Sequence, residues 1–298
     1  MHRSGTSALA RAIGLMGAGL GPAESLDHHW EQVDLWRFEN DLLRVLGSEW
    51  DTPAVFPRGW TQLPRVRQLE PLAARLVESF AAEPAWVMKD PRLCLTLPFW
   101  REQVGLSPLV VFIYRNPLEV AASLDRRDRR KRLRGARALA LWERYNCDGL
   151  ANSRDLPRIV VSYDRLLSAP VETCERVREA LSGWGVAGLK SAELGASELD
   201  TGQRHHRADG VGDDDGRQGH VTAAQARLLA DLERLERGEV AAHGASPETS
   251  VAARAVLETW RQTRRLVRAL REARGATRQL ATLVPGAMRA GKRPPGDD

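Results

Sequence analysis

The chain has 298 residues, of which 43% are hydrophobic and 28% are charged, and its formal net charge is +5. This length suits one large domain or two small ones, and the hydrophobic content is ordinary for a globular protein. No apolar run is long enough to span a bilayer, so we expect no transmembrane segment. The three scattered cysteines, Cys94, Cys147 and Cys174, have no metal-ligand spacing, so we expect a reduced, cytoplasmic compartment and no metal site.

The first seven residues, Met1-His2-Arg3-Ser4-Gly5-Thr6-Ser7, run directly into a helix-like stretch at 8–16. Glycine allows a tight turn and a close approach of the backbone to a ligand. A helix start offers unpaired N–H groups and the positive end of the helix dipole. With Arg3 as a forked cation, the segment predicts a loop that binds phosphate or sulfate.

Short apolar runs at 86–88, 109–114 and 159–161 predict strands that are buried on both faces. Between and around them we expect helices, at 33–46, 64–82, 118–125, 136–150 and 171–184. Strands that alternate with helices predict an α/β fold with a parallel sheet flanked by helices. Ligands of such sheets bind beyond the carboxyl ends of the strands.

The composition changes after residue 194. Residues 195–220 are rich in Gly, Asp, Arg and His, so we expect a mobile loop or lid between an α/β domain at 1–194 and a C-terminal helical extension at 221–284. Residues 285–298 read as a disordered tail. Within the extension, a long helix carries an apolar stripe and many arginines. This pattern fits packing on the domain, self-association with a second copy, or contact with an anionic surface, and we favour the first two.

Basic residues crowd the segment 126–137. A solvated face is the usual reason for such a run, and we favour it over attraction of an anionic cofactor or acceptor. No recognisable binding module or aromatic ladder accompanies the cluster, so we expect no nucleic-acid partner.

A second anion-binding element begins where the strand at 109–114 ends. Arg115 follows the strand, Pro117 opens a helix, and Ser123 lies about two turns into that helix. Arg115 and Ser123 therefore suit the same phosphate, one as a forked cation and the other as a neutral donor.

With both elements in view, residues 1–210 resemble the bacterial sulfotransferase family. Members of that family have a P-loop-like α/β fold and use 3′-phosphoadenosine 5′-phosphosulfate as the sulfuryl donor. The family's 5′-phosphosulfate loop matches Arg3, Ser4, Gly5, Thr6 and Ser7, and its 3′-phosphate element matches Arg115 and Ser123. Weaker similarities lie at 89–92, 142–146 and 163–167, and at 203–206, where Arg204 resembles part of a late loop that covers the cofactor.

The resemblance implies transfer of a sulfuryl group to an acceptor hydroxyl on a carbohydrate, lipid or small metabolite, without a metal. Arg3 would hold the 5′-phosphate and the leaving oxygen, and Lys89 would supply a second cation. The segment 25–31 resembles an acceptor-side segment of bacterial relatives, so we favour Glu31 as the general base, with His29 and Asp90 as the next choices. Glu31 would otherwise cap the next helix or orient a basic residue.

Two other functions stay open. A P-loop-type nucleotide kinase or NTPase would need a lysine after Gly5, which the chain lacks. A non-catalytic, anion-binding interaction protein would use the basic C-terminal helix instead. In the sulfotransferase family the anion loop follows the first strand, which is missing before Met1. We therefore expect about ten further apolar residues upstream, a length set by ordinary strands.

Overall fold

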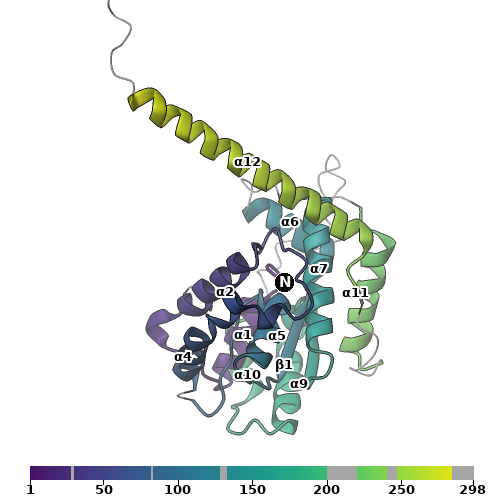
Figure 1. The fold of residues 1–298 in the computed structure, drawn as a ribbon. Helices are drawn as coiled ribbons and strands as arrows, with labels where there is room; N and C mark the ends of the chain where they lie inside the picture. Colours follow the sequence, from purple (N-terminus) through teal and green to yellow (C-terminus); the bar gives the residue numbers. More distant parts are fainter. Residues whose placement is uncertain (28–29, 82, 128–132, 200–219, 240–246, 284–298) are drawn as a thin grey trace, which may run out of the picture.

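The computed structural model describes residues 1–27, 30–81, 83–127, 133–199, 220–239 and 247–283, with the backbone alone at 275–283. Helices predominate around a small parallel sheet (Figure 1). In chain order the elements are α1 (Thr6–Leu15), η1 (Ala23–Ser25), α2 (Val33–Val45), η2 (Trp60–Gln62), α3 (Pro64–Arg67), α4 (Glu70–Phe80), α5 (Leu93–Glu102), β1 (Val110–Tyr114), α6 (Pro117–Arg127), α7 (Ala136–Asn152), β2 (Arg158–Ser162), α8 (Tyr163–Ser168), α9 (Pro170–Gly183), α10 (Ala192–Ala196), α11 (Ala223–Glu236) and α12 (Val251–Leu283). Among these described helices, none is both long and apolar enough to cross a membrane.

The described sheet consists of β1 and β2, which pair in parallel with Val110 opposite Arg158 and Tyr114 opposite Ser162. These strands confirm the predictions at 109–114 and 159–161. Alternate side chains of each strand enter two different apolar clusters, as the two-residue period of a strand requires. Both faces of the sheet are therefore covered, which explains the unbroken apolar runs.

The third predicted strand, at 86–88, is wrong. This segment is extended, but it forms only an isolated bridge in which Gly19 N donates to Ala85 O at 2.7 Å and Val87 N donates to Gly19 O at 2.8 Å. A strand needs a partner of similar length, and the described backbone offers this segment a single glycine. The apolar run correctly indicated an extended backbone, but it does not determine whether a second strand is available to pair with it.

Most of the predicted helices are confirmed to within a few residues. The exception is 64–82, which divides into α3 and α4. Pro71 has no N–H group to donate to the carbonyl of Arg67, so one helix ends and another begins with Pro71 in its first turn. Helix α5 was not expected, and it carries Pro98 in its interior.

Helix α7 lies at the centre of the larger apolar cluster. Most of its side chains are buried, including Leu141, Trp142 and Tyr145, because α5, α6, α11 and α12 pack around it. A helix surrounded in this way buries polar side chains too, and Glu143, Arg144 and Asn146 each have a hydrogen-bond or ion-pair partner. The indole N–H of Trp142 donates to the carbonyl of Arg115 at 2.9 Å, so this helix also supports the end of β1.

The C-terminal helices belong to the same core rather than to a separate unit. Leu232 of α11 and Leu257 of α12 are buried in the cluster that contains α7. At the end of α11, the Glu236 carboxylate accepts hydrogen bonds from Tyr114 Oη at 2.7 Å and from Ser162 N at 2.9 Å. The expected division after residue 194 therefore does not separate two cores. The expected tail at 285–298 lies outside the described residues, as do residues 200–219 of the expected lid.

Replacing Leu232 by alanine should lower the free energy of unfolding by about 2–5 kcal/mol, because it removes buried apolar contacts and leaves a cavity. Urea denaturation measures this loss. Leu72→Ala, at an exposed leucine of α4, is the matched control and should change stability little. Equal, small losses for both variants would show that α11 is not part of the core.

Candidate active site

The N-terminal loop turns into α1 through Gly5. This residue has a φ of 91°, in the left-handed region that favours glycine, and α1 begins at Thr6. A Cβ atom on Gly5 would fall on the ring of Tyr163, the first residue of α8. The glycine thus satisfies two requirements at once, the backbone conformation and the close packing of the ring. The predicted turn into a helix N-terminus is confirmed.

The second predicted element lies directly against this loop. Arg3 Nε donates to Ser123 Oγ at 2.9 Å, although the two residues are 120 positions apart, and Arg115 Nη1 lies 3.5 Å from the carbonyl oxygen of Arg3. The Arg115 guanidinium also lies 4.7 Å from the centre of the Tyr163 ring. Because β1 and β2 are parallel, Arg115 and Tyr163 emerge at the same edge of the sheet. The structure therefore brings the two elements together at that edge.

A cavity of about 570 Å³ opens at this edge. Most of the predicted site residues line it: Arg3, Gly5, Thr6, Ser7, Glu31, Lys89 and Arg115. Ser4 and Ser123 are buried behind its wall. Two further candidates, His29 and Arg204, lie outside the described residues.

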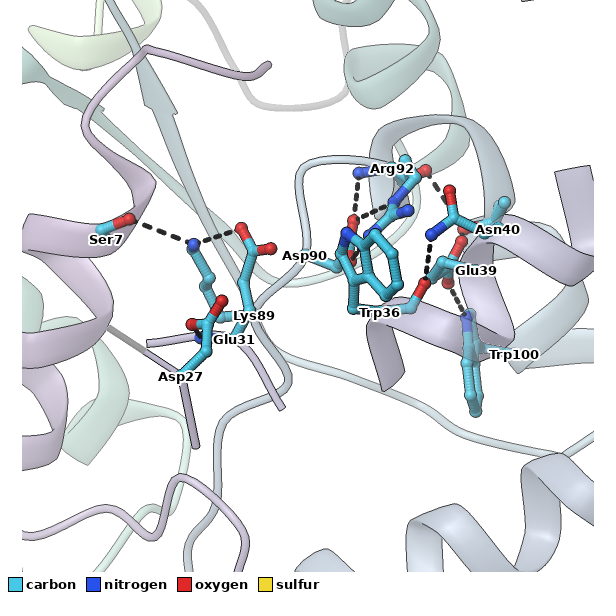
Figure 2. Close-up of polar contacts among 11 residues, drawn as sticks. Ser7, Asp27, Glu31, Trp36, Glu39, Asn40, Lys89, Asp90, Arg92 and Trp100 are labelled. Atoms are coloured by element: carbon cyan, nitrogen blue, oxygen red, sulfur yellow. Dashed lines mark hydrogen bonds and ion pairs between the residues drawn. The ribbon is translucent and has the colours of Figure 1, made fainter. Parts of the chain in front are cut away.

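Lys89 connects the N-terminal loop with the segment that carries Glu31 (Figure 2). Its Nζ donates to Ser7 Oγ at 3.1 Å and to Glu31 Oε1 at 2.6 Å. The backbone N–H of Glu31 donates to Asp27 Oδ1 at 2.9 Å, which fixes the turn before α2. Both partners of the Lys89–Glu31 ion pair are largely buried, so the pair is only weakly screened by solvent.

Burial raises the pKa of the Glu31 carboxyl above its usual value, and the neighbouring Lys89 ammonium offsets part of that rise. A carboxylate with a raised pKa is a stronger proton acceptor than an ordinary glutamate. Glu31 therefore lines the cavity, and its ion pair with Lys89 also fits the alternative expectation that it orients a basic residue.

Asp90 does not reach the cavity, which corrects its place among the candidate bases. Its side chain is fully buried, and its carboxylate accepts from Arg92 Nε at 2.8 Å and from Arg92 Nη2 at 2.5 Å. This bidentate pair holds the Arg92 guanidinium in the cavity wall, 5.7 Å from the centre of the Trp36 ring. Asp90 is thus a positioning residue for Arg92 (Figure 2).

Several lining residues were not predicted from the sequence. Trp30, Trp36 and Trp50 present three indole rings to the cavity, and Asn40 adds a side-chain amide. His2 also lines it, with its ring 4.5 Å from that of Trp50. Burial, followed by the positive charge of Arg92, lowers the pKa of His2, so this imidazole is neutral at pH 7. His2 and Trp30 lie within the predicted segments at 1–7 and 25–31 but were not among the candidate site residues, and no short motif identified Trp36, Asn40 or Trp50.

The cavity wall has an excess of cationic side chains, four of which are ion-paired: Lys89 with Glu31, Arg11 with Glu198, Arg92 with Asp90 and Arg115 with Glu119. Six cationic side chains line it, Arg3, Arg11, Lys89, Arg92, Arg115 and Arg127, against two acidic ones, Glu31 and Glu198. A concave site with such an excess of one charge attracts ligands of the opposite charge. The structure therefore favours an anionic ligand. From the arginine cluster, Arg127 contributes to this wall and Arg137 stacks 3.6 Å from the Trp260 ring, whereas residues 128–132 lie outside the described part.

A second buried carboxylate lies behind Asp90 and Arg92. Glu39 Oε1 accepts from Thr96 Oγ1 at 3.0 Å and from Trp100 Nε1 at 2.9 Å (Figure 2). Burial, reinforced by the negative charge of Asp90, raises the pKa of Glu39 to about 8. The folded protein therefore holds a proton on Glu39 at neutral pH.

Comparisons with protein-family models, with curated proteins and with solved structures found no match to this chain. A function for the site is therefore inferred from its own residues and their geometry.

Replacing Gly5 by alanine should destabilise the protein by about 1–3 kcal/mol and weaken anion binding, because alanine strains the backbone and displaces the Tyr163 ring. Thermal unfolding, with and without an added anion, measures both effects. Gly183→Ala is the matched control, since a Cβ there meets open space. A Gly5→Ala variant as stable as this control would contradict the packing of Gly5 against Tyr163.

The pH dependence of stability should reveal the buried proton on Glu39. An ordinary glutamate titrates near pH 4.5 and folded Glu39 near pH 8, so the unfolded chain loses the proton first and this contribution to stability falls as pH rises between those values. Glu39→Gln has no proton to lose. Its free energy of unfolding relative to the wild type should therefore increase from pH 5 to pH 8.

Urea denaturation at several pH values makes this comparison. Glu78→Gln, at an exposed position of α4, should show no such trend. A difference between Glu39→Gln and the wild type that stays constant with pH would contradict the raised pKa of Glu39.

Proposed function

We propose that the protein is a sulfotransferase that moves a sulfuryl group from 3′-phosphoadenosine 5′-phosphosulfate to an acceptor hydroxyl. The observation that carries the proposal is the contact between the two anion-binding elements, Arg3 with Ser123 and Arg115 with the Arg3 carbonyl. A donor with phosphates at both its 5′ and 3′ positions needs two neighbouring anion sites. The positive wall of the cavity supports the same ligand class.

The residues suggest a division of tasks. The N-terminus of α1 and the guanidinium of Arg3 would bind the 5′-phosphate, and Arg115 and Ser123 would bind the 3′-phosphate. Lys89, which donates to Ser7 and Glu31, would lie between the donor and the acceptor. This placement suits a cation that stabilises negative charge developing on the transferred group.

The transfer requires one proton movement. Glu31 would accept the proton of the acceptor hydroxyl as that oxygen forms its bond to sulfur. The bond between sulfur and the bridging oxygen of the donor breaks, and its electron pair stays on the 5′-phosphate, where Arg3 and Lys89 offset the new charge. The products are the sulfated acceptor, 3′-phosphoadenosine 5′-phosphate and a protonated Glu31.

The acceptor would occupy the side of the cavity that Trp36 and Trp50 line. Flat aromatic walls with an amide and a guanidinium nearby suit a ring that carries hydroxyl groups, among the carbohydrate, lipid and small-metabolite acceptors that the resemblance implies. The P-loop-like sulfotransferase fold and a cytoplasmic location are parts of the same proposal. Three free thiols, at Cys94, Cys147 and Cys174, support a reducing compartment.

Arg115→Ala should weaken binding of 3′-phosphoadenosine 5′-phosphate by about 2–4 kcal/mol, because a largely buried, charge-assisted contact is lost. Isothermal titration calorimetry measures the change. Arg126→Ala is the matched control, since Arg126 lies exposed at the end of the neighbouring helix and does not line the cavity. Normal binding by Arg115→Ala would refute the 3′-phosphate assignment. Magnesium-dependent turnover of ATP by the wild type would instead support a kinase or NTPase.

Glu31→Gln should lower kcat for sulfation by about 10²–10⁴-fold, the usual contribution of a general base, with little change in the affinity for the donor. A donor-dependent sulfation assay with a panel of hydroxylated acceptors provides the rates. The control is Glu24→Gln, at an exposed residue of η1. Unchanged kcat in Glu31→Gln would remove Glu31 from the mechanism while leaving donor binding intact.

A further inference from the structure

The second half of α12 leaves the body of the protein. Its first half packs on the core through Ala253 and Leu257, and Arg264 then binds the loop before η2 through Asp51 at 2.6 Å and Glu49 at 3.2 Å. Beyond that point every residue from 265 to 274 is exposed. In Figure 1 the helix continues outward past α6, with no other helix or strand of the described residues beside its far end.

This outward segment has one apolar side. At about 100° per residue, Leu266, Leu270 and Val267 fall on the same half of the helix, together with two alanines, Ala269 and Ala273. The three larger side chains are 62%, 52% and 41% exposed, respectively. Exposed large apolar residues grouped in this way mark a surface that is covered by a partner.

The other side is basic. Between residues 264 and 274 the helix carries five arginines and one glutamate, so this short segment alone has four net positive charges. By the same helical period Arg264, Arg265, Arg268 and Arg271 occupy the half opposite the leucines, whereas Arg274 falls between Leu270 and Val267. Arg268 approaches Glu49 and Glu272 only at 3.8 Å, so most of this charge is not neutralised by close ion pairs.

We propose that residues 264–274 of α12 dock on an anionic lipid surface. A helix with an apolar side, a basic side and flanking arginines suits the boundary between lipid headgroups and acyl chains, where leucines insert and arginines contact phosphates. A second copy of the helix would bring four like charges to the same contact, which opposes pairing. Nucleic acid would use the arginines but leave the leucines in water.

The docking segment begins next to the cavity. Arg264 binds Asp51, and the neighbouring Trp50 lines the cavity wall. The loop that carries Trp50 and Asp51 therefore contacts the docking segment through Asp51 and lines the cavity through Trp50. The docking proposal itself rests on α12 alone and does not depend on the proposed reaction.

Co-sedimentation of the full chain with vesicles tests the proposal. Vesicles rich in phosphatidylglycerol should bind the protein about tenfold or more tightly than vesicles of phosphatidylcholine, and added salt should weaken the binding, because the arginine contacts are screened. Equal binding to both vesicle types, or binding to neither, would overturn the proposal.

Two double variants test the two sides of the helix. Leu266→Gln with Leu270→Gln, and Arg268→Gln with Arg271→Gln, should each weaken binding to the anionic vesicles by about tenfold. The matched controls change exposed residues elsewhere: Leu72→Gln on α4, and Arg65→Gln with Arg67→Gln on α3. All of these positions are exposed, so circular dichroism should show unchanged folding.

If the leucine double variant binds the vesicles as tightly as the Leu72→Gln control does, the apolar side does not insert into the lipid and the proposal is overturned. Sedimentation velocity without vesicles tests the alternative, in which a second copy of the chain covers the apolar side of α12. A stable dimer that the leucine variant abolishes, combined with no binding to vesicles, would assign this side of α12 to a second copy and also overturn the proposal.

Discussion

The contact between Gly5 and the Tyr163 ring is the constraint on which the site depends. It requires a residue without a side chain at the start of α1, and it places the N-terminal loop against the residue that follows β2. The same ring lies 4.7 Å from the Arg115 guanidinium, which follows β1. One aromatic side chain thus sets the spacing between a loop at the N-terminus and the carboxyl ends of two parallel strands. The cavity opens where these three segments meet.

Charge is distributed around this cavity in two layers. Directly at its wall, Lys89 contacts both Ser7 and Glu31, so a cation lies between the anion loop and the carboxylate. Behind the wall, Asp90 holds the Arg92 guanidinium, which is part of the wall, in a bidentate pair. Asp90 therefore fixes the position of Arg92 and offsets its charge. This arrangement gives a preorganised positive site, which is the main requirement for stabilising a transferred anionic group.

Local sequence patterns predicted the features that depend on a residue and its near neighbours in the chain, such as the burial of a strand or a turn at a glycine. The runs that became β1 and β2 were apolar because both faces are covered, and Gly5 and Arg115 lay at a turn into a helix and at a strand end, respectively. Pairing could not be predicted in this way. The run at 86–88 has strand-like residues, but its described partner is a single glycine, Gly19.

The same limit applied to individual side chains. Asp90 follows Lys89 and lies two residues before Arg92 in the sequence, and nothing in that order distinguishes a free base from a buried partner of Arg92. Trp36 and Trp50 come from different segments, and only the tertiary structure brings both to the cavity. Glu39 reads as an ordinary polar position of a helix, yet it is fully buried beside Trp100.

The most direct measurement of the central claim is a crystal structure of the protein with 3′-phosphoadenosine 5′-phosphate. The proposed arrangement places the 3′-phosphate within hydrogen-bonding distance of Arg115 and Ser123. It places the 5′-phosphate at the N-terminus of α1, against the backbone of residues 5–7. A nucleotide bound elsewhere, or bound in the opposite orientation with its 5′-phosphate on Arg115, would contradict the assignment of the two elements.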